Sequence, residues 1–102
     1  MYDEFFIKRL TELRIQRGVS AREMSLSLGQ NAGYINNIES GKAFPSMTVF
    51  FYICEYLHVT PQEFFDEANT VPEQMRALMD CARHLNRSQL SSLISIAREL
   101  QH

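Results

Sequence analysis

Residues 18–46, GVSAREMSLSLGQNAGYINNIESGKAFPS, constrain the fold more than any other part of this chain. Ser20 followed by Glu23 is a capping box, in which each side chain satisfies a backbone N–H at a helix start. Gly29 and Gly41 stand where helices typically end, because glycine readily adopts the left-handed conformation found there. The segment therefore predicts two short helices joined by a tight turn. The apolar residues expected to pack them together are Met24, Leu28, Ile35 and Ile38.

Start and stop signals on either side of this segment predict two further helices. Phe5–Arg17 carries an apolar stripe and is followed by Gly18, a typical left-handed helix stop. Ser46 is a helix cap, and the residues that follow it as far as Leu57 are strongly apolar. Because apolar residues nearly encircle this helix, we expect it to lie at the centre of a small bundle.

The C-terminal half carries three more helix starts. Thr60-Pro61-Gln62-Glu63 combines a cap, a first-turn proline and a box glutamate, and we expect its short helix to bury Phe64 and Phe65. Thr70–Glu73 and Asn86–Gln89 begin two amphipathic helices joined by a short loop. Since no stretch shows the period-two alternation of strands, the prediction is an all-α protein. Five helices would occupy residues 1–68 and a two-helix hairpin residues 69–102.

The last predicted helix has an unusually wide apolar face. At 100° per residue its apolar positions cover an arc of about 160°, more than one neighbouring helix can cover. We expect the part of the apolar face that one neighbour leaves uncovered to contact a second copy of the chain. The alternative is that this helix folds back onto the first and fifth helices. The residues of the expected homodimer interface are Leu90, Leu93, Ile94, Ile96, Ala97 and Leu100.

Composition narrows the class of protein. The 102 residues suffice for about one domain, and 45% hydrophobic with 22% charged residues is ordinary for a globular protein. The net charge is −2, yet residues 8–44 hold six basic and three acidic residues, a surplus of +3. The positive charge therefore gathers around the two short helices. The basic residues of this stretch are Lys8, Arg9, Arg14, Arg17, Arg22 and Lys42.

Several functional classes are disfavoured by what the sequence lacks. The longest nearly apolar stretch, Met47–Leu57, is far short of the roughly 20 residues that span a bilayer, so we expect no membrane partner and a cytoplasmic protein. Cys54 and Cys81 are two isolated thiols in apolar, helical-looking surroundings, and the scattered histidines do not form a ligand cluster with them, so we expect two buried thiols and no metal. Without a phosphate loop or a nucleophile–base pair, we expect neither an enzyme nor a cofactor.

The ordered set of motifs resembles the Cro/phage-repressor type of helix-turn-helix protein, the XRE family of bacteria and phages, over roughly residues 4–66. The resemblance implies a lambda-repressor-like DNA-binding domain of five helices. It also implies a bidentate ion pair between Arg14 and Glu39 that fixes the angle of the third helix. The motifs are Leu13-Arg14, Gly18-Val19-Ser20, Glu23-Met24, Leu28-Gly29, Ile35-x-x-Ile38-Glu39-x-Gly41, Pro45-Ser46 and Leu57-x-Val59-Thr60-Pro61-x-Glu63-Phe64-Phe65.

The same resemblance places the third helix, about residues 31–40, in the DNA major groove. Asparagine can bond adenine there through two hydrogen bonds. Gly33 is read either as a close approach to DNA or as a turn residue, and Tyr34 either as a phosphate contact or as part of the core. The expected base-reading residues are Asn31, Ala32, Gly33, Asn36 and Asn37. The expected phosphate contacts are Arg17, Ser20, Arg22, Tyr34, Lys42 and Ser46.

Two functional hypotheses follow. The first is a homodimeric, sequence-specific transcriptional regulator, most simply a repressor, bound to a palindromic operator in double-stranded DNA. The second is a protein-interaction module that antagonises a related regulator and has lost base reading. Ala21, Ala32 and Gly33 favour the second hypothesis because they stand where the family carries DNA-contacting side chains. Its partner would be another regulatory protein.

Overall fold

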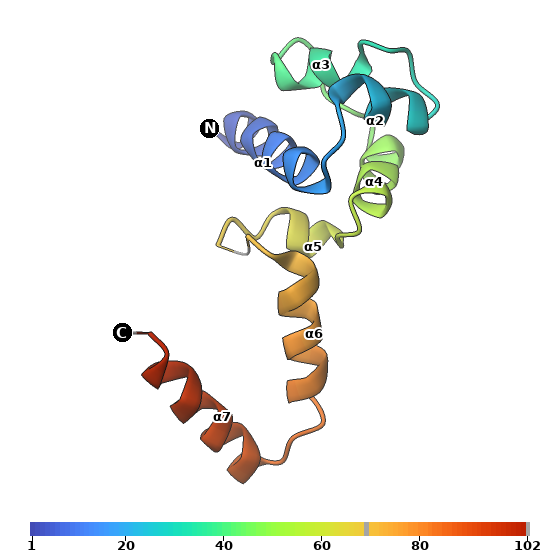
Figure 1. Ribbon diagram of the computed structural model, residues 1–102. Helices are drawn as coiled ribbons and strands as arrows, with labels where there is room; N and C mark the ends of the chain where they lie inside the picture. The colour runs from blue at the N-terminus through green and yellow to red at the C-terminus, as the bar shows by residue number, and fades with distance from the viewer. Residues whose placement is uncertain (69, 102) are drawn as a thin grey trace. The chain divides into compact units, whose positions relative to one another are not determined.

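The computed structural model describes residues 1–68 and 70–101, and the regular structure of those residues is entirely α-helical (Figure 1). The all-α prediction is confirmed. The chain divides into two compact units, Met1–Thr70 with the first five helices and Val71–His102 with the last two. The helices are α1 (Tyr2–Arg17), α2 (Ala21–Ser27), α3 (Tyr34–Glu39), α4 (Met47–Tyr56), α5 (Pro61–Phe64), α6 (Pro72–Ala82) and α7 (Arg87–Glu99).

The predicted helix signals have the geometry that their residue types favour. Gly18 ends α1 at a φ of 76°, a conformation that costs glycine nothing. At the start of α2, the Glu23 N–H donates to the Ser20 hydroxyl at 3.0 Å, and the Ser20 N–H donates to the Glu23 carboxylate at 3.3 Å. A second capping box joins Thr60 and Glu63 at the start of α5. The one early boundary is α1, which begins at Tyr2 instead of Phe5.

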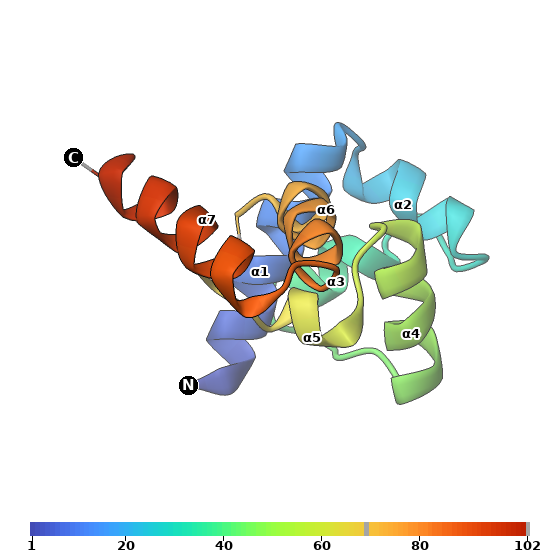
Figure 2. The same cartoon turned by 90° about the horizontal axis from the view of Figure 1, so that it is seen from below.

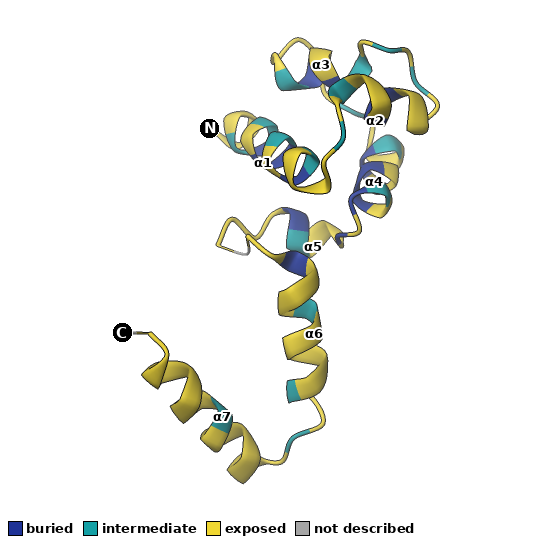
Figure 3. Ribbon diagram, viewed as in Figure 1, coloured by how far each residue is buried: buried dark blue, intermediate teal, exposed yellow. Residues whose placement is uncertain are grey.

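The first unit has a well-formed apolar core. Each of its fully buried apolar side chains stabilises the fold by about 1.5–3 kcal/mol relative to an exposed one. Buried residues occur on each of α1 to α5 (Figure 3). The apolar residues with no exposed surface are Leu10, Met24, Ile35, Ile38, Ile53 and Phe64.

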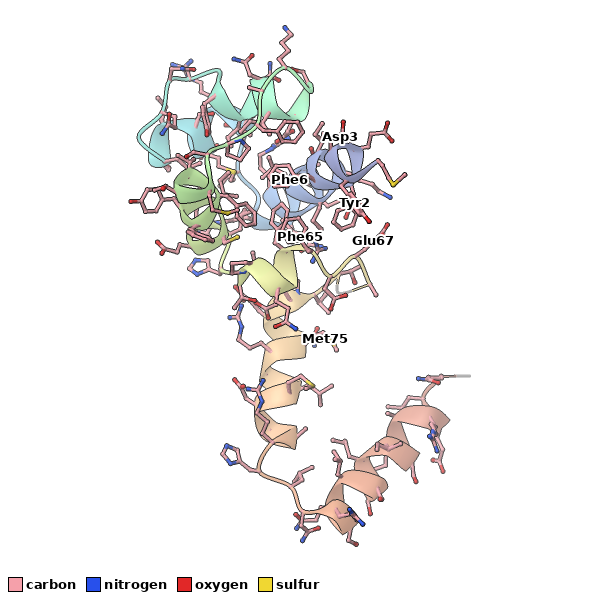
Figure 4. All side chains as sticks on the ribbon, turned by 180° about the vertical axis from the view of Figure 1, so that it is seen from behind. Tyr2, Asp3, Phe6, Phe65, Glu67 and Met75 are labelled. Carbon is pink, nitrogen blue, oxygen red and sulfur yellow. The ribbon has the colours of Figure 1, made fainter. Side chains whose placement is uncertain are left out.

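All seven phenylalanines of the chain belong to one connected aromatic cluster. Phe6 lies at its centre, 5.1 Å from Phe64 and 6.4 Å from Phe65 between ring centroids (Figure 4). The prediction that Phe65 is buried is wrong, since 51% of it is exposed. Phe65 is the residue at which α5 ends, and it points about 100° away from Phe64, so it lies at the edge of the aromatic cluster with half of its surface exposed.

α4 lies at the edge of the first unit, so its predicted central place is wrong. Phe50, Ile53 and Cys54 face the core, whereas Phe51 and Tyr52 are about half exposed. A unit with five short helices has too few neighbours to surround one of them completely. The apolar outer face of α4 is therefore surface.

A buried arginine joins the two ends of the first unit, and the sequence did not predict it. Arg9 on α1 is only 2% exposed. Its Nε donates to the carbonyl of Phe64 at 2.6 Å, and its Nη2 donates to the carbonyl of Glu63 at 2.7 Å. These carbonyls belong to the end of α5, where a helix leaves acceptors unsatisfied and its dipole favours a cation. Arg9 therefore anchors α5 to α1 and adds nothing to the surface charge.

The second unit is an open hairpin. α6 and α7 diverge from the turn that joins them (Figures 1 and 2). α7 starts with a capping box, in which the Gln89 N–H donates to the Asn86 side chain at 2.8 Å. All of α7 is described, and it has no buried residue. Cys81 is exposed, contrary to prediction, because these two helices enclose no core of their own: the buried residue of α6 is Pro72, at its start. Within residues 1–68 and 70–101, no helix is long and apolar enough to cross a membrane.

Candidate nucleic-acid interface

α2 and α3 form the two helices of the predicted motif, but α3 is shorter than expected. It begins at Tyr34, so Asn31, Ala32 and Gly33 lie in the turn before it instead of within a helix of residues 31–40. The Asn31 side-chain oxygen accepts a hydrogen bond from the Gly33 N–H at 3.1 Å. Asparagine often bonds the local backbone in this way, and such a bond competes with the first turn of a helix.

The backbone at Gly33 has no need of glycine. Its φ is −94°, a value that any residue adopts, and a Cβ atom there would lie 3.7 Å from the Asn31 oxygen, an ordinary contact. A turn requirement therefore does not explain this glycine. The reading as a site of close approach to DNA stays a prediction.

A buried serine fixes the start of α3 against α2, and it was not singled out from the sequence. The Ser25 hydroxyl donates to the Ala21 carbonyl at 2.7 Å and accepts from the Ile35 N–H at 2.9 Å. Ile35 N is one of the donors that a helix start leaves without an intrahelical partner. The sequence offered one sign of this role, which is that Ser25 directly follows the core residue Met24 on the same helix.

An ion pair sets the far end of α3 against α1, as the family resemblance implies. Arg14 Nε lies 2.7 Å from Glu39 Oε2, and Arg14 Nη2 lies 2.9 Å from Glu39 Oε1. The two side chains are only 16% and 14% exposed, and the hydrogen bonds to Glu39 raise the pKa of Arg14. Arg14 also donates to the Val19 carbonyl at 3.0 Å. Two parallel bonds from a planar guanidinium restrict the direction in which α3 projects.

The outward face of α3 is polar and uncharged. Ile35 and Ile38 are buried, so the helical period places Gly33, Asn36, Asn37 and Ser40 on the opposite side. Asn36, Asn37 and Ser40 are all exposed. Ser40 was missed by the sequence reading, although its spacing from 33, 36 and 37 is that of one helix face. We call Asn36, Asn37 and Ser40 the α3 polar face.

The cations near this face are fewer than the sequence count indicates. Arg22 and Lys42 are exposed, while Arg9 is buried and Arg14 is paired with Glu39. Arg17 is exposed too, and its guanidinium carbon lies 4.9 Å from the centroid of the Tyr56 ring. Phosphate attraction from this unit would therefore come from the edges of the motif, with none on α3 itself.

The remaining predicted contacts have mixed surroundings. Ser20 and Ser46 are exposed; their oxygens accept capping bonds from the Glu23 and Val49 N–H groups, and each hydroxyl hydrogen is left to donate. Tyr34 is half-buried and packs against the core, and this burial raises its pKa. The core reading of Tyr34 therefore has structural support, and its phosphate contact stays a prediction.

The predicted dimer residues are available on the surface of the second unit. Leu93 is half-buried, and the other five are exposed. Among the described residues, no group of three or more histidine, cysteine or acidic side chains is placed to hold a metal ion.

Comparison with known proteins agrees with this geometry. Residues 7–70 match the family model of a helix-turn-helix domain, which is more than half of the chain. No curated protein and no solved structure matches the chain significantly. The matched region covers α2, α3 and the residues that hold them, and a domain of this kind indicates a DNA-binding regulator.

Proposed function

We propose that this chain, which belongs to the helix-turn-helix domain family, is a sequence-specific transcriptional regulator that reads DNA with the α3 polar face. The observation that carries the proposal is the way α3 is held. Ser25 bonds the backbone at its start, and Arg14 bonds Glu39 at its end. A helix only six residues long is thereby held in one orientation with its exposed amides outward.

The chemistry of this face favours adenine. An asparagine amide donates from its NH2 group to adenine N7 and accepts at its oxygen from the adenine N6 amino group, so it matches the adenine edge in the major groove. Each good pair of this kind discriminates against the wrong base by about 1–3 kcal/mol. Asn36 and Asn37 supply two such amides. Because Gly33 has no side chain, it would let the backbone at the start of α3 approach the base edges closely.

Phosphate binding would come from the residues at the edges of the motif. Arg17, Arg22 and Lys42 supply about three contacts per chain, so a dimer would show a log–log salt slope near −5. This slope is typical of moderate electrostatic binding. A strongly basic DNA-coating protein would show a steeper one.

A homodimeric repressor is the simplest form of such a regulator. Two α3 helices would enter successive major grooves of a palindromic operator about 34 Å apart. The exposed apolar face of α7 supports the dimer, because it has no cover within its own unit. A repressor would then act by blocking a promoter that overlaps the operator.

The direct test is a gel shift of the full chain with the DNA upstream of its own gene, from low to moderate salt. The proposal predicts a discrete complex that survives excess unrelated DNA and a salt slope near −5 for the dimer. If no fragment is bound even at low salt, the proposal is wrong.

The antagonist hypothesis keeps one observation in its favour. The burial of Arg9 and the pairing of Arg14 leave the first unit with less exposed positive charge than its composition indicates. Under this hypothesis, Asn36→Ala with Asn37→Ala would leave every measured phenotype intact. Leu93→Asp would abolish it, since the partner would bind the second unit.

A further inference from the structure

The apolar residues of α7 and its C-cap residue Leu100 are arranged symmetrically about position 95. Leu90 and Leu100 are each five residues from it, Leu93 and Ala97 two residues, and Ile94 and Ile96 one residue. Reversing the direction of the helix therefore reproduces the same apolar pattern. A surface with this property is complementary to itself under a two-fold rotation, as an isologous interface requires.

The pattern also gives matched shapes when two α7 helices pack antiparallel. Leu93 would lie level with the partner's Ala97, so a large side chain meets a small one at the centre of the contact. Such alternation of large and small residues allows two helix faces to interdigitate closely. Leu90 would lie level with the partner's Leu100 and close each end of the contact.

The second unit exposes enough apolar surface for this contact. Six apolar side chains of α6 and α7, together with the C-cap residue Leu100, are between 38% and 79% exposed, which is on the order of 500 Å² per chain. Two copies would bury about 1,000 Å², the lower limit for a biological interface. The opposite face of α7 stays polar. The side chains are Met75, Leu78, Met79, Leu90, Ile94, Ile96 and Leu100 on the apolar face, and Ser88, Ser91, Ser92 and Ser95 on the polar face.

We infer that two copies of this chain pair through their second units, with the two α7 helices antiparallel and the two-fold axis at the level of Ser95. This inference rests on the homodimer of the proposed function. It adds which helix forms the contact, the relative direction of the two helices and the residue level at which they cross. The α6 methionines would cover the sides of the paired helices, since Met75 and Met79 are exposed on the same unit.

Cysteine cross-linking with a short bis-maleimide tests the direction and register. Cys81→Ser provides the background, because Cys81 is exposed and Cys54 is buried. At 1.5 Å per residue, two copies of position 90 would be about 15 Å apart along the helices, whereas positions 90 and 100 would be level. Leu90→Cys and Leu100→Cys should each fail to cross-link alone and should cross-link when co-expressed. Ser95→Cys is the control on the polar face and should not cross-link.

The possible results separate this inference from the proposed function. Cross-linking of Leu90→Cys with itself would indicate parallel helices and overturn the inference. A full chain that sediments as a monomer would also overturn the inference. If that monomer still gave a gel shift with DNA, the proposed DNA-binding function would be retained. If cross-linking follows the antiparallel pattern but no DNA binds, the pairing stands and the DNA-binding proposal fails. Ile94→Asp should halve the sedimenting mass, while its neighbour Ser95→Asp should leave it unchanged.

Discussion

The two units of this chain contrast in how they are stabilised. In the first, α1 to α5 enclose a continuous apolar core, and buried hydrogen bonds from Arg9 and Ser25 fix the helix ends. In the second, α7 begins with a capping box and α6 begins with Pro72 and no side-chain cap, and α7 has no buried residue. Local helix signals and tertiary burial are therefore separate requirements for a stable helical unit. The first unit meets both from its own residues, whereas the second leaves its apolar face to be covered by another surface.

The largest expected effect comes from removing a core side chain in the first unit. Ile38→Ala should lower the free energy of unfolding by about 2–5 kcal/mol, because Ile38 is fully buried. Urea unfolding at several protein concentrations measures it. Ile96→Ala in the second unit should change unfolding of the first unit by less than about 0.5 kcal/mol. Equal effects of the two substitutions would remove the contrast between the units.

The buried arginine gives the next largest effect. Arg9→Met should destabilise the first unit by about 3 kcal/mol, because two carbonyls at the end of α5 lose a charged donor. Arg22→Met changes an exposed arginine of the same unit and should stay within about 0.5 kcal/mol. Thermal unfolding of both variants measures the difference, and a neutral Arg9→Met would show that α5 does not depend on this anchor.

Ser25→Ala tests the contact between α2 and α3. The substitution leaves the buried Ile35 N–H without its acceptor and should cost about 1–3 kcal/mol. Ser27→Ala, an exposed serine on the same helix, is the matched control. Hydrogen exchange at the Ile35 amide should become faster in Ser25→Ala alone. Unchanged protection of that amide would contradict the role given to Ser25.

The smallest effect is chemical and distinguishes the two cysteines. Burial raises the pKa of the Cys54 thiol to about 11, so at pH 8 it stays protonated and unreactive in the folded protein. Cys81 is exposed in the second unit. A thiol reagent at pH 8 should therefore label one cysteine quickly and the other only after unfolding. Rapid labelling of both would show that the core around Cys54 opens readily.

Much of the fold could be predicted because its signals are local. Ser20 with Glu23, Thr60 with Glu63 and the glycine at 18 determine helix ends through atoms a few residues apart. The features that were missed depend on residues far apart in sequence. Arg9 bonds carbonyls about 55 residues away, and a charged residue read without its partner is taken for a surface one.

The candidate site was partly predictable for the same reason. The family resemblance supplied the ion pair of Arg14 with Glu39 and the expected base contacts Asn36 and Asn37. The start of α3 was wrong because the Asn31 side chain bonds the Gly33 N–H and holds the turn open. The exposure of Ser40 could be predicted from helical periodicity. The role of Ser25 could not, because it depends on a hydrogen bond to the next helix.

The decisive measurement for DNA reading by the α3 polar face is the DNA affinity of the double variant Asn36→Ala with Asn37→Ala. Fluorescence anisotropy would measure the binding of this variant to the upstream operator and to unrelated DNA. The same measurements on the unmodified chain and on Gln62→Ala, an exposed neutral position on α5, are the controls. If the α3 polar face reads DNA, the double variant loses about 1–3 kcal/mol of binding free energy per asparagine on the operator alone, with non-specific binding and folding unchanged. Operator binding that is unaffected by the double substitution would contradict DNA reading by this face.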